Sequence, residues 1–214
     1  MKKFITPIIF LCSFTLYAQV DLSGGMGISF VNSPSFRDYI NIVYAPSGDK
    51  ISTFYTAINF YAEADYSLSE TFQLGVDYAV LIYSFNTNIG LGVYDISYTH
   101  HKPSLLAYYV IPGKGFKIKL GGGAGYRIVT VSEKLPTSGS RIKYTSGGLG
   151  LLVKVKGDTA IGEKLYANIG LDLRFDLPGE PENNGKKMHN GALREDVNLN
   201  SLSVGISLGI SYFF

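Results

Sequence analysis

The sequence ends in LSVGISLGISYFF, residues Leu202–Phe214, where apolar and small side chains alternate one by one. Alternation with a period of two indicates a β-strand with two unlike faces. One face is apolar and ends in aromatic rings, and the other carries Ser and Gly apart from Phe213. A strand of a soluble sandwich would expose Lys, Glu and Thr on its polar face, whereas small residues suit the interior of a narrow barrel. The segment therefore predicts a strand whose apolar face looks outward into lipid.

The same alternation recurs along the whole chain and predicts a series of further strands. The expected strands are residues 20–31, 52–68, 72–85, 96–111, 116–131, 141–156, 164–177 and 202–214. Most of them exceed the roughly 9–11 residues that cross a bilayer. The connections alternate between long or polar loops (32–51, 86–95, 132–140, 178–197) and short turns (69–71, 112–115, 157–163). This pattern predicts an all-β fold, a closed antiparallel up-and-down transmembrane β-barrel of about eight strands.

Two local departures from the strand pattern are expected. Pro103 sits inside the fourth strand, and because proline removes a ladder donor we expect a bulge or a local break there. In the first loop, Ser33 followed by Pro34 reads as an N-cap and a first-turn proline, so residues 34–42 could form a short helix.

The first residues form a targeting segment. Lys2 and Lys3 precede an apolar stretch, and Ala18 is a small residue before a plausible cleavage point. We therefore expect a signal peptide at residues 1–18 and an outer-membrane β-barrel at residues 19–214. Cys12 is the only cysteine, and the bulky Leu11 before it argues against lipidation of that thiol. Without the signal peptide the chain is near neutral, which gives no reason to expect a nucleic-acid partner.

From Val20 to Phe214 the chain resembles the small bacterial outer-membrane barrels of the OmpA/OmpX type and, more loosely, OmpW-type barrels. The motif-like part is the terminal ISYFF. The resemblance implies that Tyr212 and Phe214 form the signal that the barrel-assembly machinery reads. It also implies a monomer in the bacterial outer membrane, in contact with outer-membrane lipid and lipopolysaccharide. The resemblance supplies no catalytic motif, no cofactor and no metal site.

Charged residues on the small, inward faces predict a network in the lumen. An eight-stranded barrel is only wide enough for its own side chains, so charges inside it must pair. Glu63 is expected opposite Asp77 across a tight turn, and two acids side by side need cations. We expect an acidic wall to face a basic wall through the lumen. The network would comprise Glu63, Asp65, Asp77, Lys117, Lys119, Arg127, Lys154, Lys156, Asp172 and Arg174.

Three classes of function remain open at this point. The leading one is a structural or surface-interaction barrel with a side-chain-filled lumen and no catalytic site. The second is a porin-like channel for small solutes or hydrophobic compounds, lined by the same charges. The third is a lipid-modifying enzyme using His100 or His101, but adjacent strand residues point to opposite faces, so at most one could serve a given site. Otherwise both would be polar residues at the lipopolysaccharide boundary.

Overall fold

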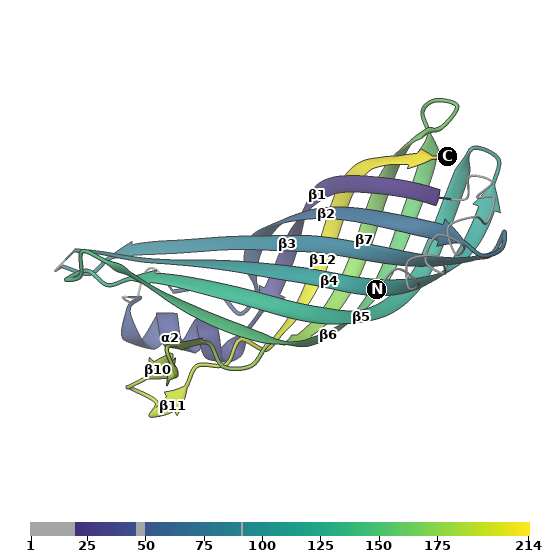
Figure 1. The fold of residues 1–214 in the computed structure, drawn as a ribbon. Helices are drawn as coiled ribbons and strands as arrows, with labels where there is room; N and C mark the ends of the chain where they lie inside the picture. Colours follow the sequence, from purple (N-terminus) through teal and green to yellow (C-terminus); the bar gives the residue numbers. More distant parts are fainter. Residues whose placement is uncertain (1–19, 46–49, 91) are drawn as a thin grey trace, which may run out of the picture.

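The computed structural model describes residues 20–45, 50–90 and 92–214, so the expected signal peptide and Cys12 lie outside the described residues. The chain forms a closed antiparallel barrel of eight strands, which confirms the predicted fold (Figure 1). The barrel strands are β1 (Val20–Asn32), β2 (Tyr55–Ser67), β3 (Phe72–Asn88), β4 (Val93–Gly113), β5 (Phe116–Lys134), β6 (Arg141–Ala160), β7 (Leu165–Leu177) and β12 (Ser201–Phe213). No helix among the described residues is long and apolar enough to cross a bilayer.

Pairing between β12 and β1 closes the sheet with a large stagger. A path through paired residues from Asp21 returns to β1 at Val31 instead of at its starting point. The path runs Asp21, Asp65, Gly75, Leu106, Gly123, Leu152, Arg174, Ser203, Val31. A closed sheet with such a stagger has strongly tilted strands, and at this strand number its interior is filled by side chains.

Burial is inverted relative to a soluble protein. Leu105 and Leu149 on the outside are each 69% exposed, whereas Lys119 and Arg127 on the inside are 0% exposed. A soluble protein would bury the leucines and expose the charges. The outer surface is therefore suited to lipid. We call the barrel end where β1 begins and β12 ends the terminal mouth.

Four strands continue past the others on one side of the molecule. The strands β3, β4, β5 and β6 contain 17, 21, 19 and 20 residues, whereas β1, β2, β7 and β12 contain 13 each. Figure 1 shows β3–β6 projecting together beyond the barrel. We call this projection the wall. It takes up most of the predicted loop 86–95 and the first residues of the predicted loop 132–140, because β3 reaches Asn88, β4 begins at Val93 and β5 reaches Lys134.

The helix α2 (Pro34–Val43) lies against the inner side of the wall, one residue longer than the predicted helix (Figure 1). Pro34 occupies the first turn, as predicted. The predicted loop 178–197 contributes the short strands β8 (Glu182–Asn183), β9 (Lys186–Lys187), β10 (His189–Asn190) and β11 (Glu195–Asp196). The buried residues that form this outer core are Val31, Phe36, Tyr39, Ile40, Ala45, Ile51, Tyr55, Ala57, Leu81, Tyr94, Ile96, Tyr98, Val129, Val131, Met188, Val197 and Leu199.

The apolar face of β4 changes sides along the strand. Leu105 and Tyr109 face outward in the barrel, but Ile96 and Tyr98 face inward in the wall. The odd positions are thus apolar in the barrel and polar in most of the wall, whereas the even positions are apolar in the wall and also at Leu106, Tyr108 and Val110 in the barrel. The same change occurs in β5, between the outward Ile128 and the inward Val129. Along both strands the outward side chains therefore change from apolar in the barrel to polar in the wall, where the inward side chains are mostly apolar.

The structure shows the local break expected at Pro103, without a bulge. The β4 strand runs through it without a bulge, because His101 pairs with Ile128 and Ser104 pairs with Gly125 in one unbroken register. Only the ladder towards β5 is interrupted, since Lys102 and Pro103 have no paired residue on that side. On the other side Pro103 stays in register with Tyr78 of β3. The missing N–H of proline therefore interrupts one ladder without shifting the register of the strand.

Candidate functional site in the barrel lumen

In the middle of the lumen, acids of β2 and β3 pair with lysines of β6. Glu63 lies in register with Asp77, and both carboxylates point inside. The Lys154 Nζ lies 2.5 Å from Glu63 Oε2 and 3.2 Å from Asp77 Oδ1. The Lys156 Nζ pairs with Glu63 Oε1 and lies 3.3 Å from Asp65 Oδ2. Each lysine thus neutralises two acids across the lumen.

A second set of contacts lies nearer the terminal mouth. Lys119 Nζ lies 2.7 Å from Asp65 Oδ2 and 2.9 Å from Asp21 Oδ2. Tyr108 donates its hydroxyl proton to Glu63 Oε2 at 3.0 Å. Sequence reasoning missed Asp21, because the other inward residues read for the first strand were Ser and Gly. Its odd position, in step with Ser23, was the available signal.

A third cluster lies nearer α2 and centres on Asp176. Its Oδ2 accepts from Lys102 Nζ at 2.8 Å, and its Oδ1 accepts from Arg127 Nε. Arg127 therefore pairs with Asp176 and not with the acids of β2 and β3. Arg174 bridges Asp172 at 2.8 Å and Asp77 at 3.3 Å, and so links this cluster to the one that contains Glu63 and Lys154. Each of these side chains is at most 4% exposed.

Lys117 differs from the rest of the expected network. Its side chain is 28% exposed, and its Nζ is 3.5 Å from Asp21 Oδ2. The same ammonium lies 3.8 Å from the centre of the Phe213 ring. Lys117 thus stands at the rim of the terminal mouth, and the buried network begins behind it.

Apolar and aromatic packing occupies the other end of the lumen. Glu133 is buried there, and its Oε1 accepts from the hydroxyls of Tyr39 at 2.6 Å and Tyr94 at 2.8 Å. Burial raises the pKa of Tyr39, and the neighbouring carboxylate of Glu133 raises it further. Tyr39 therefore stays neutral, and its hydroxyl group donates the hydrogen bond that connects α2 to β5. The ion-pair network and the outer core thus follow one another along the axis of the barrel.

The two adjacent histidines lie on opposite sides of the barrel wall. His100 is 0% exposed, and its Nδ1 lies 2.9 Å from the Tyr98 hydroxyl. His101 faces outward, with its Nδ1 2.8 Å from the Tyr78 hydroxyl. The expectation that both are polar residues at the lipopolysaccharide boundary is wrong for His100, because the inward phase of β4 carries it into the interior. Within the described residues, no group of three or more His, Cys, Asp or Glu is placed to hold a metal ion.

The terminal aromatic residues alternate as their strand requires. Tyr212 and Phe214 face outward, 40% and 51% exposed, with their ring centres 4.8 Å apart. Phe213 faces inward and stacks on Tyr166 at 4.1 Å. The proposed assembly signal is therefore displayed on the outer surface of the barrel.

Solved structures with the same fold are outer-membrane barrels. Neisserial surface protein A superposes with a TM-score of 0.56 at 14% identity, covering 92% of this chain and 98% of that one. Ail of Yersinia pestis, in complex with the heparin analogue sucrose octasulfate, gives 0.54 at 11% identity, with 91% and 97% covered. OprG of Pseudomonas aeruginosa gives 0.51 at 16% identity, with 92% and 97% covered. No protein-family model and no curated protein matches the sequence.

Proposed function

We propose that the protein is an integral outer-membrane barrel with a closed lumen and a structural or surface-interaction role, without catalysis. The observation that carries this proposal is the filled interior. Ion pairs occupy the lumen from the terminal mouth to Asp176, and the outer core occupies the rest. A charge taken out of water is stable only when it is paired, so these contacts favour a sealed barrel over a water-filled pore.

The wall supplies the surface for interaction. In the outer membrane the short turns of the terminal mouth would face the periplasm, and the wall would stand outside the cell. Its outward face carries polar rows that cross all four strands in register. One row is Ser84, Ser97, Ser132 and Lys143, and the next is Asn86, Asp95, Lys134 and Arg141. Hydroxyl, amide and charged groups in such rows suit contact with polar partners outside the cell.

Planar-bilayer conductance of the purified protein tests the closed lumen. We expect no steady open channels, because opening a path would separate buried ion pairs and disrupt the outer core. A variant in which Phe36 of α2 is replaced by Ala serves as a comparison, since it loosens the outer core and leaves the ion pairs intact. Steady conductance of the unmodified protein would overturn the proposal and favour a small-solute channel.

The non-catalytic part of the proposal has a separate test. We expect cells expressing the protein with His100→Asn or His101→Asn to show the same lipid A profile as cells with the unmodified protein. A modification of lipid A that depends on the protein and disappears with either variant would establish an enzyme instead.

A further inference from the structure

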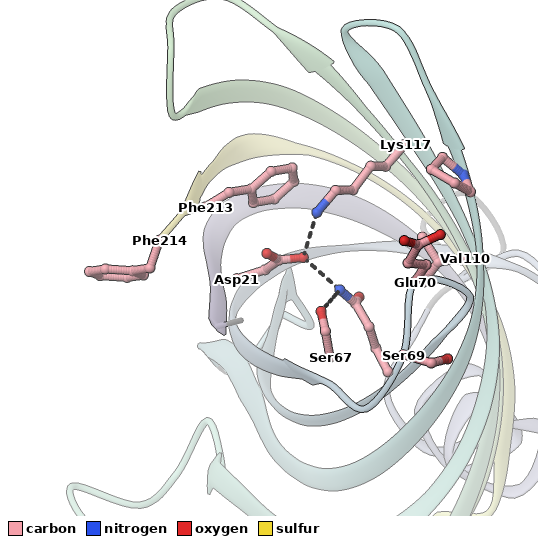
Figure 2. A pocket seen from close by; sticks show the side chains of 10 residues that line it. Asp21, Ser67, Ser69, Glu70, Val110, Lys117, Phe213 and Phe214 are labelled. Atoms are coloured by element: carbon pink, nitrogen blue, oxygen red, sulfur yellow. Dashed lines mark hydrogen bonds and ion pairs between the residues drawn. The ribbon is translucent and has the colours of Figure 1, made fainter. Parts of the chain in front are cut away.

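The terminal mouth contains a cavity of about 340 Å³ that the proposed function does not use (Figure 2). Pockets for small ligands begin at about 300 Å³. Strands β1 to β5, the turn after β2, and the end of the chain at β12 contribute to its lining. The lining residues that matter below are Asp21, Ser67, Glu70, Gln73, Lys117 and Phe213.

The cavity presents one cation and one anion that the lumen network does not fully use. Asp21 already accepts from Lys119 at 2.9 Å and from Gln73 at 2.9 Å. Lys117 lies 3.5 Å from the same carboxylate, beyond the 2.7–2.9 Å typical of a charged hydrogen bond. Glu70 is exposed, and no ion pair of its carboxylate occurs among the described residues. Figure 2 shows Lys117 and Glu70 on different sides of the cavity.

A buried acceptor beside them lacks a donor. Gln73 is 2% exposed, and its Nε2 donates to Asp21 at 2.9 Å and to the Ser67 hydroxyl at 2.7 Å. Because only the amide nitrogen can donate to a carboxylate, these two bonds fix the orientation of the amide. The remaining Oε1 has no hydrogen-bond partner among the described residues. A ligand with N–H donors would satisfy it.

The cavity lies at the depth of the lipid headgroups. Three of its lining residues are sequence neighbours of outward aromatic residues at the terminal mouth. The neighbouring pairs are Tyr66–Ser67, Phe72–Gln73 and Phe213–Phe214. Aromatic rings at this position mark the boundary between lipid and water. In Figure 2 the ring of Phe214 points away from the cavity while Phe213 lies beside it.

We propose that this cavity binds the headgroup of a phospholipid that carries a primary ammonium and a phosphate, a phosphoethanolamine group. The ammonium donates to Glu70 and to Gln73 Oε1, and the phosphate pairs with Lys117. The two methylenes between them contact the Phe213 ring. The site requires only that the barrel spans a membrane. It does not depend on whether the lumen conducts, so the conductance test and the test below fail independently.

Native mass spectrometry of the full barrel released from lipid nanodiscs tests the site. Three lipids with matched acyl chains serve as probes: phosphatidylethanolamine, phosphatidylcholine, which has a phosphate but no ammonium N–H, and phosphatidylglycerol, which has no ammonium. We expect the ethanolamine lipid to be retained about tenfold better than the other two. Glu70→Gln should abolish that preference without changing retention of phosphatidylglycerol, whereas Lys117→Gln should lower retention of all three.

The controls are charged residues in other turns of the same mouth. Lys114 and Glu163 are exposed and do not line the cavity. We expect Lys114→Gln and Glu163→Gln to retain the lipids as the unmodified barrel does. Soluble glycerophosphoethanolamine should compete with the lipid in a Glu70-dependent manner. Equal retention of the three lipids, equal effects of Glu70→Gln and Glu163→Gln, or binding of the soluble compound alone would overturn the proposal.

Discussion

Replacing Asp176 by Asn should be among the most destabilising single changes in the lumen. Asp176 is the only carboxylate paired with Lys102 and with Arg127 among the described residues. Removal of one partner from a buried pair costs about 3–5 kcal/mol, because the other charge stays buried without compensation. Arg127 keeps hydrogen bonds through Nη1 to Ser104 Oγ at 3.1 Å and to the Tyr126 carbonyl at 3.0 Å. Within the described residues the Lys102 ammonium has no other hydrogen bond, so we expect a loss of about 4 kcal/mol.

The matched comparison is Asp172→Asn. In the part of the chain that the structure describes, Asp172 is paired only with Arg174, and Arg174 keeps Asp77 at 3.3 Å after the change. The expected loss is therefore near that of one hydrogen bond to a charged group, about 1.5–3 kcal/mol. Equilibrium unfolding by urea in phospholipid vesicles measures both free energies. Equal losses for the two variants, or a loss below about 1 kcal/mol for Asp176→Asn, would refute the reasoning that stranded cations set the cost.

Three further outcomes are expected. Phe36→Ala should reduce the stability of the outer core by about 3–5 kcal/mol, because Phe36 is 0% exposed. Faster proteolysis of α2 measures this, and an unchanged rate would count against the packing. Deletion of Phe214 should impair insertion into the outer membrane while export continues, measured by heat-modifiable mobility of membrane fractions; normal insertion would refute the assembly role. The hydrogen bond from His189 holds the pKa of Asp196 below its ordinary value, so pairing of β10 with β11 is favoured above about pH 4 and weakens as the pH falls further. Amide exchange at Val197, which donates to the Met188 carbonyl at 2.8 Å, measures this; equal protection at pH 6 and pH 3 would contradict it.

The barrel itself was predictable from the sequence because each membrane strand repeats one simple rule. Outward side chains must be apolar in lipid, and inward ones must be small or paired in a narrow lumen. The terminal strand follows that rule almost without exception, and the register of Glu63 with Asp77 follows from the length of one short turn. Local periodicity and turn length suffice for these features.

The cluster around Asp176 and the outer core were not predictable in the same way. Lys102 stands between His101 and Pro103, where neither apolar nor small residues mark the phase of the strand. The outer core was missed because its strands keep alternating in the wall, but there the apolar side chains face inward and the polar ones face outward. In β4 the odd positions from Asp95 to His101 are polar while Ile96 and Tyr98 at even positions are apolar, and this change was the available signal. Reading it requires knowing where lipid gives way to water, which no single strand reveals alone.

The change from apolar to polar outward side chains along β4 and β5 also fixes how deep these strands sit in the membrane. A strand that slid by two residues would keep every side chain on its proper face, so facing alone does not fix its height. The slide would nevertheless carry Ile128 towards water or bring the polar outward Thr130 towards lipid. Because β4 and β5 switch at neighbouring positions, both strands resist the same displacement in both directions. The position of this change along the strands therefore sets the depth of the barrel along the membrane normal. It also sets the height of the wall above the membrane surface.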